Sequence, residues 1–141
     1  MVDREVLDRR LQKLEQLLGR LRRLSGVERE RYLGDTGLQA QAERWLHLAA
    51  ETAIDIANHI IADRGWPVPE SYRDCFRRLV DNGVIPEDLG RQMERWAALR
   101  NVLVHMYLEV DQETLFDILT GDISQLERFA SCVLAYVEQE H

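Results

Sequence analysis

The segment LQAQAERWLHLAAETAIDIANHIIADR, residues 38–64, carries apolar side chains over about half of its circumference when it is plotted as a helix at roughly 100° per residue. A helix with so wide an apolar face is buried against more than one neighbour. The sequence GWPVP at 65–69 then ends it, because glycine and proline stop helices. The segment therefore predicts the long central helix of a helical bundle.

Helical patterns continue on both sides of this segment. Apolar residues recur at three-and-four spacing over 2–24, and breaks or capping residues mark the boundaries of the others. The further helices are expected at 2–24, around 27–33, at 71–81 and 86–109, after a cap at Asp111, and from Asp122 to about Glu138. The caps expected for the remaining starts are Asp35 or Thr36 and Glu70 or Ser71. Since no strand, repeat or low-complexity linker is evident, the fold class predicted is all-α: one domain over residues 1–141, an up-and-down bundle of four or five main helices with short helices added.

Composition narrows the classes of function. A net charge of −7 over 141 residues argues against a protein that coats nucleic acid, although an enzyme could still act on RNA through a small local basic site. Cys75 and Cys132 share no metal-binding spacing, and no signal peptide or disulfide framework is evident, so a reducing, cytoplasmic location is expected. The apolar runs are too short to span a bilayer, and no membrane association is predicted.

Three polar residues of the central helix, Glu51, Asp55 and His59, recur at intervals of four. Carboxylates and imidazole on one helical face can bind Zn or Mn. The alternative is a polar bundle face with an Asp–His hydrogen bond. Because no second cluster completes a set of ligands, no metal site is predicted.

Segment 86–109 contains two apolar stripes on roughly opposite sides. The stripe expected to face the core comprises Trp96, Leu99, Val102, Leu103 and Met106, and the second comprises Met93, Ala97, Val104 and Leu108. A helix with two apolar stripes is covered twice. The second cover could be another helix of the chain or a second copy of the protein. In a two-fold homodimer the same patch would meet itself, and a homodimer is the assembly predicted.

Four polar residues border the second stripe. Arg100 and Tyr107 lie on one flank, and Asn101 and His105 on the other. Singly, each has an ordinary structural explanation. Together they suit metal-free RNA cleavage: His105 takes the proton of the ribose 2′-OH, and Arg100 stabilises the phosphate that this oxygen attacks. DNA lacks that hydroxyl and would be spared.

The remaining two side chains have supporting roles in this hypothesis. Asn101 would orient His105 or the phosphate, and Tyr107 would bind substrate or be modified. Arg100 and His105 lie roughly 140° apart on the helix, so one site could take its Arg and His from the same chain or from two.

These residues also carry a family resemblance. RNVLVHMY at 100–107 resembles the R-x4-6-H signature of the HEPN superfamily, in the R-N-x3-H-x-Y form typical of HepT-like toxins. ERWLHLAAETAIDIANHII at 43–61 and SYRDCFRRLVDNGVIPEDL at 71–89 resemble the preceding segments of that family, in the same order. The likeness covers nearly the whole chain.

The resemblance implies an all-helical homodimer that acts as the endoribonuclease toxin of a type VII toxin–antitoxin pair. It implies Arg100 and His105 as the catalytic pair, supported by Asn101. It further implies that Tyr107 accepts AMP from a cognate MntA-like minimal nucleotidyltransferase, the antitoxin. No cofactor is expected in this chain, because ATP and Mg would be used by the partner. The RNA would be tRNA or mRNA.

A second interpretation comes from another class. HEPN domains also resemble the helical accessory subunits that bind a nucleotide or substrate for a nucleotidyltransferase. In that interpretation, Arg100 would only bind a phosphate, and His105 would line the binding site as a hydrogen-bonding group. The complete Arg–Asn–His–Tyr set favours the nuclease, since binding alone needs no proton shuttle. A third alternative is a structural dimer with no activity of its own.

Overall fold

The computed structural model describes residues 3–105 and 110–139, and within these ranges the chain is helical without any strand. The helices are α1 (Arg4–Ser25), α2 (Arg29–Leu33), α3 (Thr36–Arg64), α4 (Tyr72–Asp81), α5 (Glu87–Val104), α6 (Gln112–Gly121) and α7 (Ile123–Glu138). The all-α prediction is confirmed. Among the described helices, none has both the length and the apolar character needed to cross a membrane.

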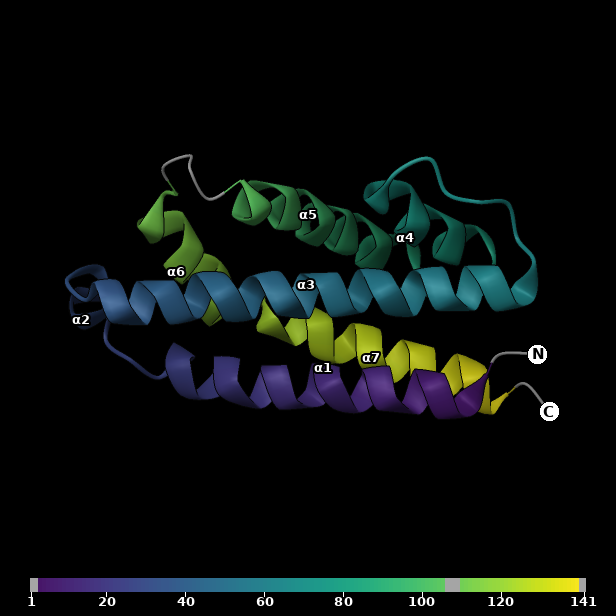
Figure 1. Ribbon diagram of the computed structural model, residues 1–141, viewed down its shortest axis with the longest axis horizontal. Helices are drawn as coiled ribbons and strands as arrows, with labels where there is room; N and C mark the ends of the chain where they lie inside the picture. Colours follow the sequence, from purple (N-terminus) through teal and green to yellow (C-terminus); the bar gives the residue numbers. More distant parts are fainter. Residues whose placement is uncertain (1–2, 106–109, 140–141) are drawn as a thin grey trace.

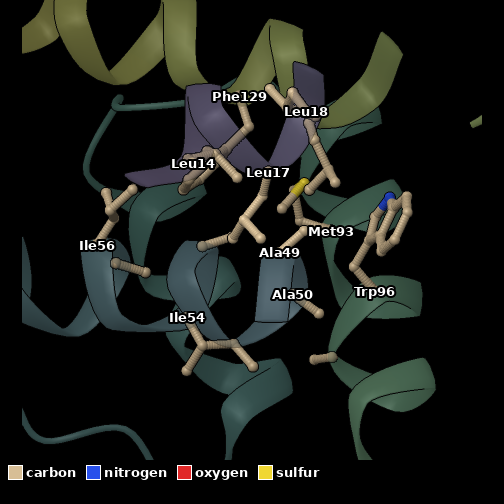
Figure 2. Close-up of a cluster of buried hydrophobic side chains, with 14 of the residues drawn as sticks. Leu14, Leu17, Leu18, Ala49, Ala50, Ile54, Ile56, Met93, Trp96 and Phe129 are labelled. Carbon is tan, nitrogen blue, oxygen red and sulfur yellow. The ribbon is translucent and has the colours of Figure 1, made fainter. Parts of the chain in front are cut away.

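Helix α3 is the central element of the bundle. It runs the length of the molecule, with α1 and α7 along one side and α4 and α5 along the other, while α2 and α6 lie at one end (Figure 1). Side chains from α1, α3, α5 and α7 meet in a common core, where Leu17, Ala49 and Met93 lie close together (Figure 2). The wide apolar face of α3 is thus buried by several neighbours, as predicted.

Helix starts follow local capping chemistry. The carboxylate of Asp35 accepts hydrogen bonds from the backbone of Gly37 and Leu38, and Ser71 and Asp111 cap α4 and α6 in the same way. At the other end of α3, Gly65 adopts a left-handed conformation with φ +70°. Glycine reaches this region without a steric penalty, so the chain turns here into residues 66–71.

Helices α4 and α5 pack unusually closely. A Cβ atom at Gly90 would overlap Cγ2 of Val80, so only glycine allows this approach. Arg77 of α4 adds a two-pronged ion pair with Glu87 of α5, at 2.6 and 2.9 Å. Its guanidinium lowers the pKa of the Glu87 carboxyl through these hydrogen bonds. The two helices therefore form a fixed pair, with Tyr72 at the start of one and Arg100 in the last turns of the other.

Two predictions for the 86–109 segment are wrong. Helix α5 ends at Val104, because His105 has φ −90° and ψ 60° and so leaves the helical region. Met93 and Ala97 of the supposed second stripe are completely buried in the chain's own core, whereas Val102 of the supposed core stripe is 48% exposed. Helix α5 is thus covered by α3, α4 and α7 along most of its length. The positions of Met106, Tyr107 and Leu108 lie outside the described residues.

Candidate functional site around Arg100

Arg100 projects from α5 onto α3, where it meets Glu51. Its Nε donates to Glu51 Oε2 at 2.6 Å, and its Nη2 lies 3.5 Å from Oε1. The two side chains retain 18% and 34% of their exposure, so the pair is shielded on one side and open to solvent on the other. These hydrogen bonds raise the pKa of Arg100 above its usual value, and the guanidinium stays charged.

Two further side chains fix the orientation of the guanidinium. The ring of Tyr72, the first residue of α4, lies 4.6 Å from the guanidinium carbon of Arg100, a cation–π distance. Asn101 Oδ1 accepts a hydrogen bond from Arg100 Nη1 at 3.1 Å. Described residues thus engage three of the five guanidinium N–H groups, and two remain, the number that a forked phosphate contact requires.

Of the other residues singled out in the sequence, His105 ends α5 and is exposed, and Asn101 is exposed one turn before it. Arg100 and Asn101 are in direct contact, while His105 lies at the same end of the same helix. The predicted modification site, Tyr107, falls outside the described residues.

Two of the three α3 residues considered for a metal, Glu51 and His59, lie against other side chains. Glu51 binds Arg100, and His59 Nε2 lies 3.1 Å from Asp63 Oδ2. Within residues 3–105 and 110–139, no three His, Cys, Asp or Glu side chains are grouped closely enough to hold a metal ion. The clearest role on this face is that of Glu51, whose carboxylate anchors the guanidinium of Arg100.

Sequence reasoning missed three members of this site: Glu51 as the partner of Arg100, Tyr72 and His47. His47 Nε2 lies 3.9 Å from Glu51 Oε2, one helical turn away. Burial lowers the pKa of His47, and the nearby positive charge of Arg100 lowers it further, against the opposing effect of Glu51. The only available signal was the polar face of 38–64, which contains both His47 and Glu51 but does not show what faces it.

A cavity of about 700 Å³ adjoins the site. It lies between the second half of α3, the 66–71 segment and the start of α4, and two of its lining residues, Tyr72 and Asn101, also contact Arg100. Its walls are mainly apolar, with Trp66 and Val68 among them. A volume of this size is typical of sites for small molecules or single groups of larger ligands.

Comparison with known proteins gives one consistent result. Residues 14–133 match the model of the family described as ribonuclease HepT-like. The mRNA nuclease HepT of Shewanella oneidensis is 25% identical over 93% of this chain and 98% of its own length, and the tRNA nuclease HepT of Aphanizomenon flos-aquae is 24% identical over 94% and 90%. A solved structure, the tri-AMPylated HEPN toxin of Shewanella oneidensis in complex with MNT antitoxin, superimposes with a TM-score of 0.87 at 25% identity, covering 94% of this chain and 99% of that one.

Proposed function

The chain belongs to the HepT-like ribonuclease family, and from that premise we propose that it is a metal-independent endoribonuclease toxin in which Arg100 and His105 cleave RNA. The observation that carries the proposal is the anchoring of Arg100 by Glu51, Tyr72 and Asn101. These three contacts hold the guanidinium in one orientation, while the Arg100 side chain keeps 18% of its exposure. Preorganised positive charge is what a phosphate-centred transition state requires.

The chemistry balances with groups of this chain. His105 accepts the proton of a ribose 2′-OH, and the 2′-oxygen forms a bond to the adjacent phosphorus. The bond from phosphorus to the 5′-oxygen breaks, which leaves a 2′,3′-cyclic phosphate and a 5′-hydroxyl whose proton comes from an imidazolium or from water. Arg100 stabilises the added negative charge of the five-coordinate phosphate more than that of the ground state, so it lowers the barrier. Asn101 supports Arg100 through its side-chain oxygen.

The active form is proposed to be a homodimer. Val102 and Val104, which are 48% and 39% exposed, lie in the last turn of α5 between Arg100 and His105. Burying these two side chains against their copies would bring two sets of Arg100 and His105 to one seam, with the same patch used twice. The proposed seam is narrower than the sequence suggested, because Met93 and Ala97 belong to the core of the monomer.

Neutralisation is proposed to come from a partner antitoxin, an MntA-like nucleotidyltransferase. The related toxin of Shewanella oneidensis is AMPylated and in complex with an MNT antitoxin. In this chain Tyr107 is the proposed acceptor, two residues after His105. A phosphate-bearing adduct there would occupy the positive charge of Arg100 and exclude RNA. ATP and Mg²⁺ would be used by the partner, and both proteins would act in the cytoplasm.

The test is cleavage of RNA by purified protein in the presence of EDTA. Wild type is expected to cleave RNA, to spare DNA of the same sequence and to leave 2′,3′-cyclic ends, whereas His105→Ala and Arg100→Ala should be inactive while remaining folded. Arg73→Ala, which changes an exposed arginine on α4, is the matched charge control. Absence of cleavage by soluble, unmodified wild type would overturn the proposal and favour the accessory-subunit interpretation.

A further inference from the structure

The cavity beside Arg100 is lined by groups that suit a flat, uncharged ring. Trp66 and Tyr72 contribute aromatic surfaces, and Asn58 and Asn101 contribute side-chain amides. Within the described part of the chain, the side-chain amide of Asn58 has no hydrogen-bond partner, so its donor and acceptor are available to a ligand. Aromatic faces with amide groups beside them are the usual means by which proteins bind an unpaired nucleobase.

The charge of the lining argues against a phosphate inside the cavity. Among the described residues that line the cavity, the only ionisable side chain apart from the phenol of Tyr72 is the carboxylate of Glu70. This carboxylate would repel an anion, and none of the described lining residues offers a cation to offset the repulsion. The cation lies just outside, at Arg100, against the Tyr72 ring that also lines the cavity. A ligand with a neutral ring and an adjacent phosphate matches this arrangement.

We infer that this cavity is a nucleobase subsite, which receives one of the two bases flanking the phosphate held by Arg100. The inference rests on the proposed ribonuclease function and adds a determinant of where the RNA is cut. Tyr72 connects the cavity with Arg100, because its ring packs against the guanidinium and also lines the cavity. Base binding would therefore place the ribose and its phosphate in register with Arg100.

The test uses oligonucleotides that are DNA except for one central ribonucleotide, so that each has a single cleavable phosphate. The bases on the two sides of this phosphate are varied in turn, and each is also replaced by an abasic residue. At one of the two positions, removal of the base is expected to lower kcat/KM between about fivefold and a hundredfold, the range for loss of one base–aromatic stack. Asn58→Ala should reduce the differences among the four bases at that position, because it removes the amide that distinguishes them.

Ala62→Trp tests the cavity without removing a polar group. Ala62 lines the cavity from α3, and an indole there would fill the space meant for a base. The variant should lower kcat/KM on the complete oligonucleotide to the value of the abasic one, and it should cleave the abasic oligonucleotide as fast as wild type does. The matched control is Ala40→Trp, the same substitution at an exposed alanine of the same helix, roughly 33 Å away along its axis.

The outcomes separate this inference from the function on which it rests. If wild type cleaves none of these oligonucleotides or longer RNA, the proposed function itself fails. If it cleaves them with equal rates for all bases and for the abasic residue, the function stands and the subsite is refuted. Equal loss of activity in Ala62→Trp on complete and abasic oligonucleotides would also refute it, since the indole would then be blocking Arg100 alone.

Discussion

Replacing Glu51 by Gln should separate two effects of this carboxylate on Arg100, the positioning of the guanidinium and the partial neutralisation of its charge. It holds the guanidinium in place through hydrogen bonds of 2.6 and 3.5 Å, and it partly cancels the positive charge that RNA would meet in the proposed mechanism. Glutamine has nearly the same shape but no charge. The variant should therefore bind RNA more tightly and cleave it more slowly, a combination that a merely destabilised site would not give.

The magnitudes follow from Coulomb's law and from hydrogen-bond energies. A phosphate on the far side of the guanidinium would lie about 6 Å from the Glu51 carboxylate, a repulsion of roughly 0.7–2.8 kcal/mol for effective dielectric constants between about 80 and 20. Since the Glu51 side chain keeps 34% of its exposure, the lower half of that range applies. KM should then fall about threefold to twentyfold. The loss of a charge-assisted hydrogen bond should lower the free energy of unfolding by about 1 kcal/mol.

The assay is steady-state cleavage of a fluorogenic RNA, together with urea unfolding. Glu51→Asp, which keeps the charge but withdraws it by one methylene group, should lower kcat without lowering KM. Asp55→Asn removes an exposed carboxylate one turn further along α3 and is the control for a general change in charge. If Glu51→Gln leaves KM, kcat and the unfolding free energy as in wild type, the ion pair has no role in positioning Arg100.

The other predictions concern packing, titration, modification and assembly. In Gly90→Ala, the overlap with Val80 should lower the free energy of unfolding by about 1–3 kcal/mol, while the better helix propensity of alanine should return about 1 kcal/mol. Combining it with Val80→Ala should relieve the overlap, so additive effects of the two substitutions in urea unfolding would refute the close contact. Because burial lowers the pKa of His47 in the folded protein, the unfolded chain takes up the proton at higher pH, and the free energy of unfolding should fall as the pH drops below about 6.5. The fall should be less steep in His47→Gln, and a steeper fall in this variant would refute the reasoning. Tyr107→Phe should prevent AMP incorporation by the cognate nucleotidyltransferase with ATP and Mg²⁺, and mass spectrometry that finds AMP still attached would move the acceptor elsewhere. Val104→Glu should halve the mass measured by light scattering, and an unchanged mass would exclude this seam.

The boundaries of most helices could be predicted from the sequence because they depend on neighbouring residues. Asp35, Ser71 and Asp111 cap helices through hydrogen bonds that reach only two or three residues along the chain. The end of α5 has no such signal. No glycine or proline stands near His105, and only the β-branched Val102 and Val104 weaken the helix before it ends.

The partners within the site depend on contacts that periodicity does not encode. A helical wheel groups the residues of one helix, but it does not say which other helix lies against each side. It therefore mistook Met93 for an interface residue and Val102 for a core residue. Glu51 and Arg100 are 49 positions apart in the sequence, and only the packing of α5 on α3 makes them a pair.

The missing side chain at Gly90 gives the α4–α5 pair the properties of a lever. The contact between Gly90 and Val80 is its fulcrum. Arg100 lies roughly 15 Å from this contact along α5, and Tyr72 lies roughly 12 Å from it along α4. A tilt of about 5° at the fulcrum would move Arg100 by roughly 1.3 Å relative to the ring on which it rests, and displacements of about 1 Å can cost a catalytic site two orders of magnitude in rate. The alignment of guanidinium and tyrosine is thus sensitive to one methyl group that lies about three helical turns from Arg100 and about two from Tyr72.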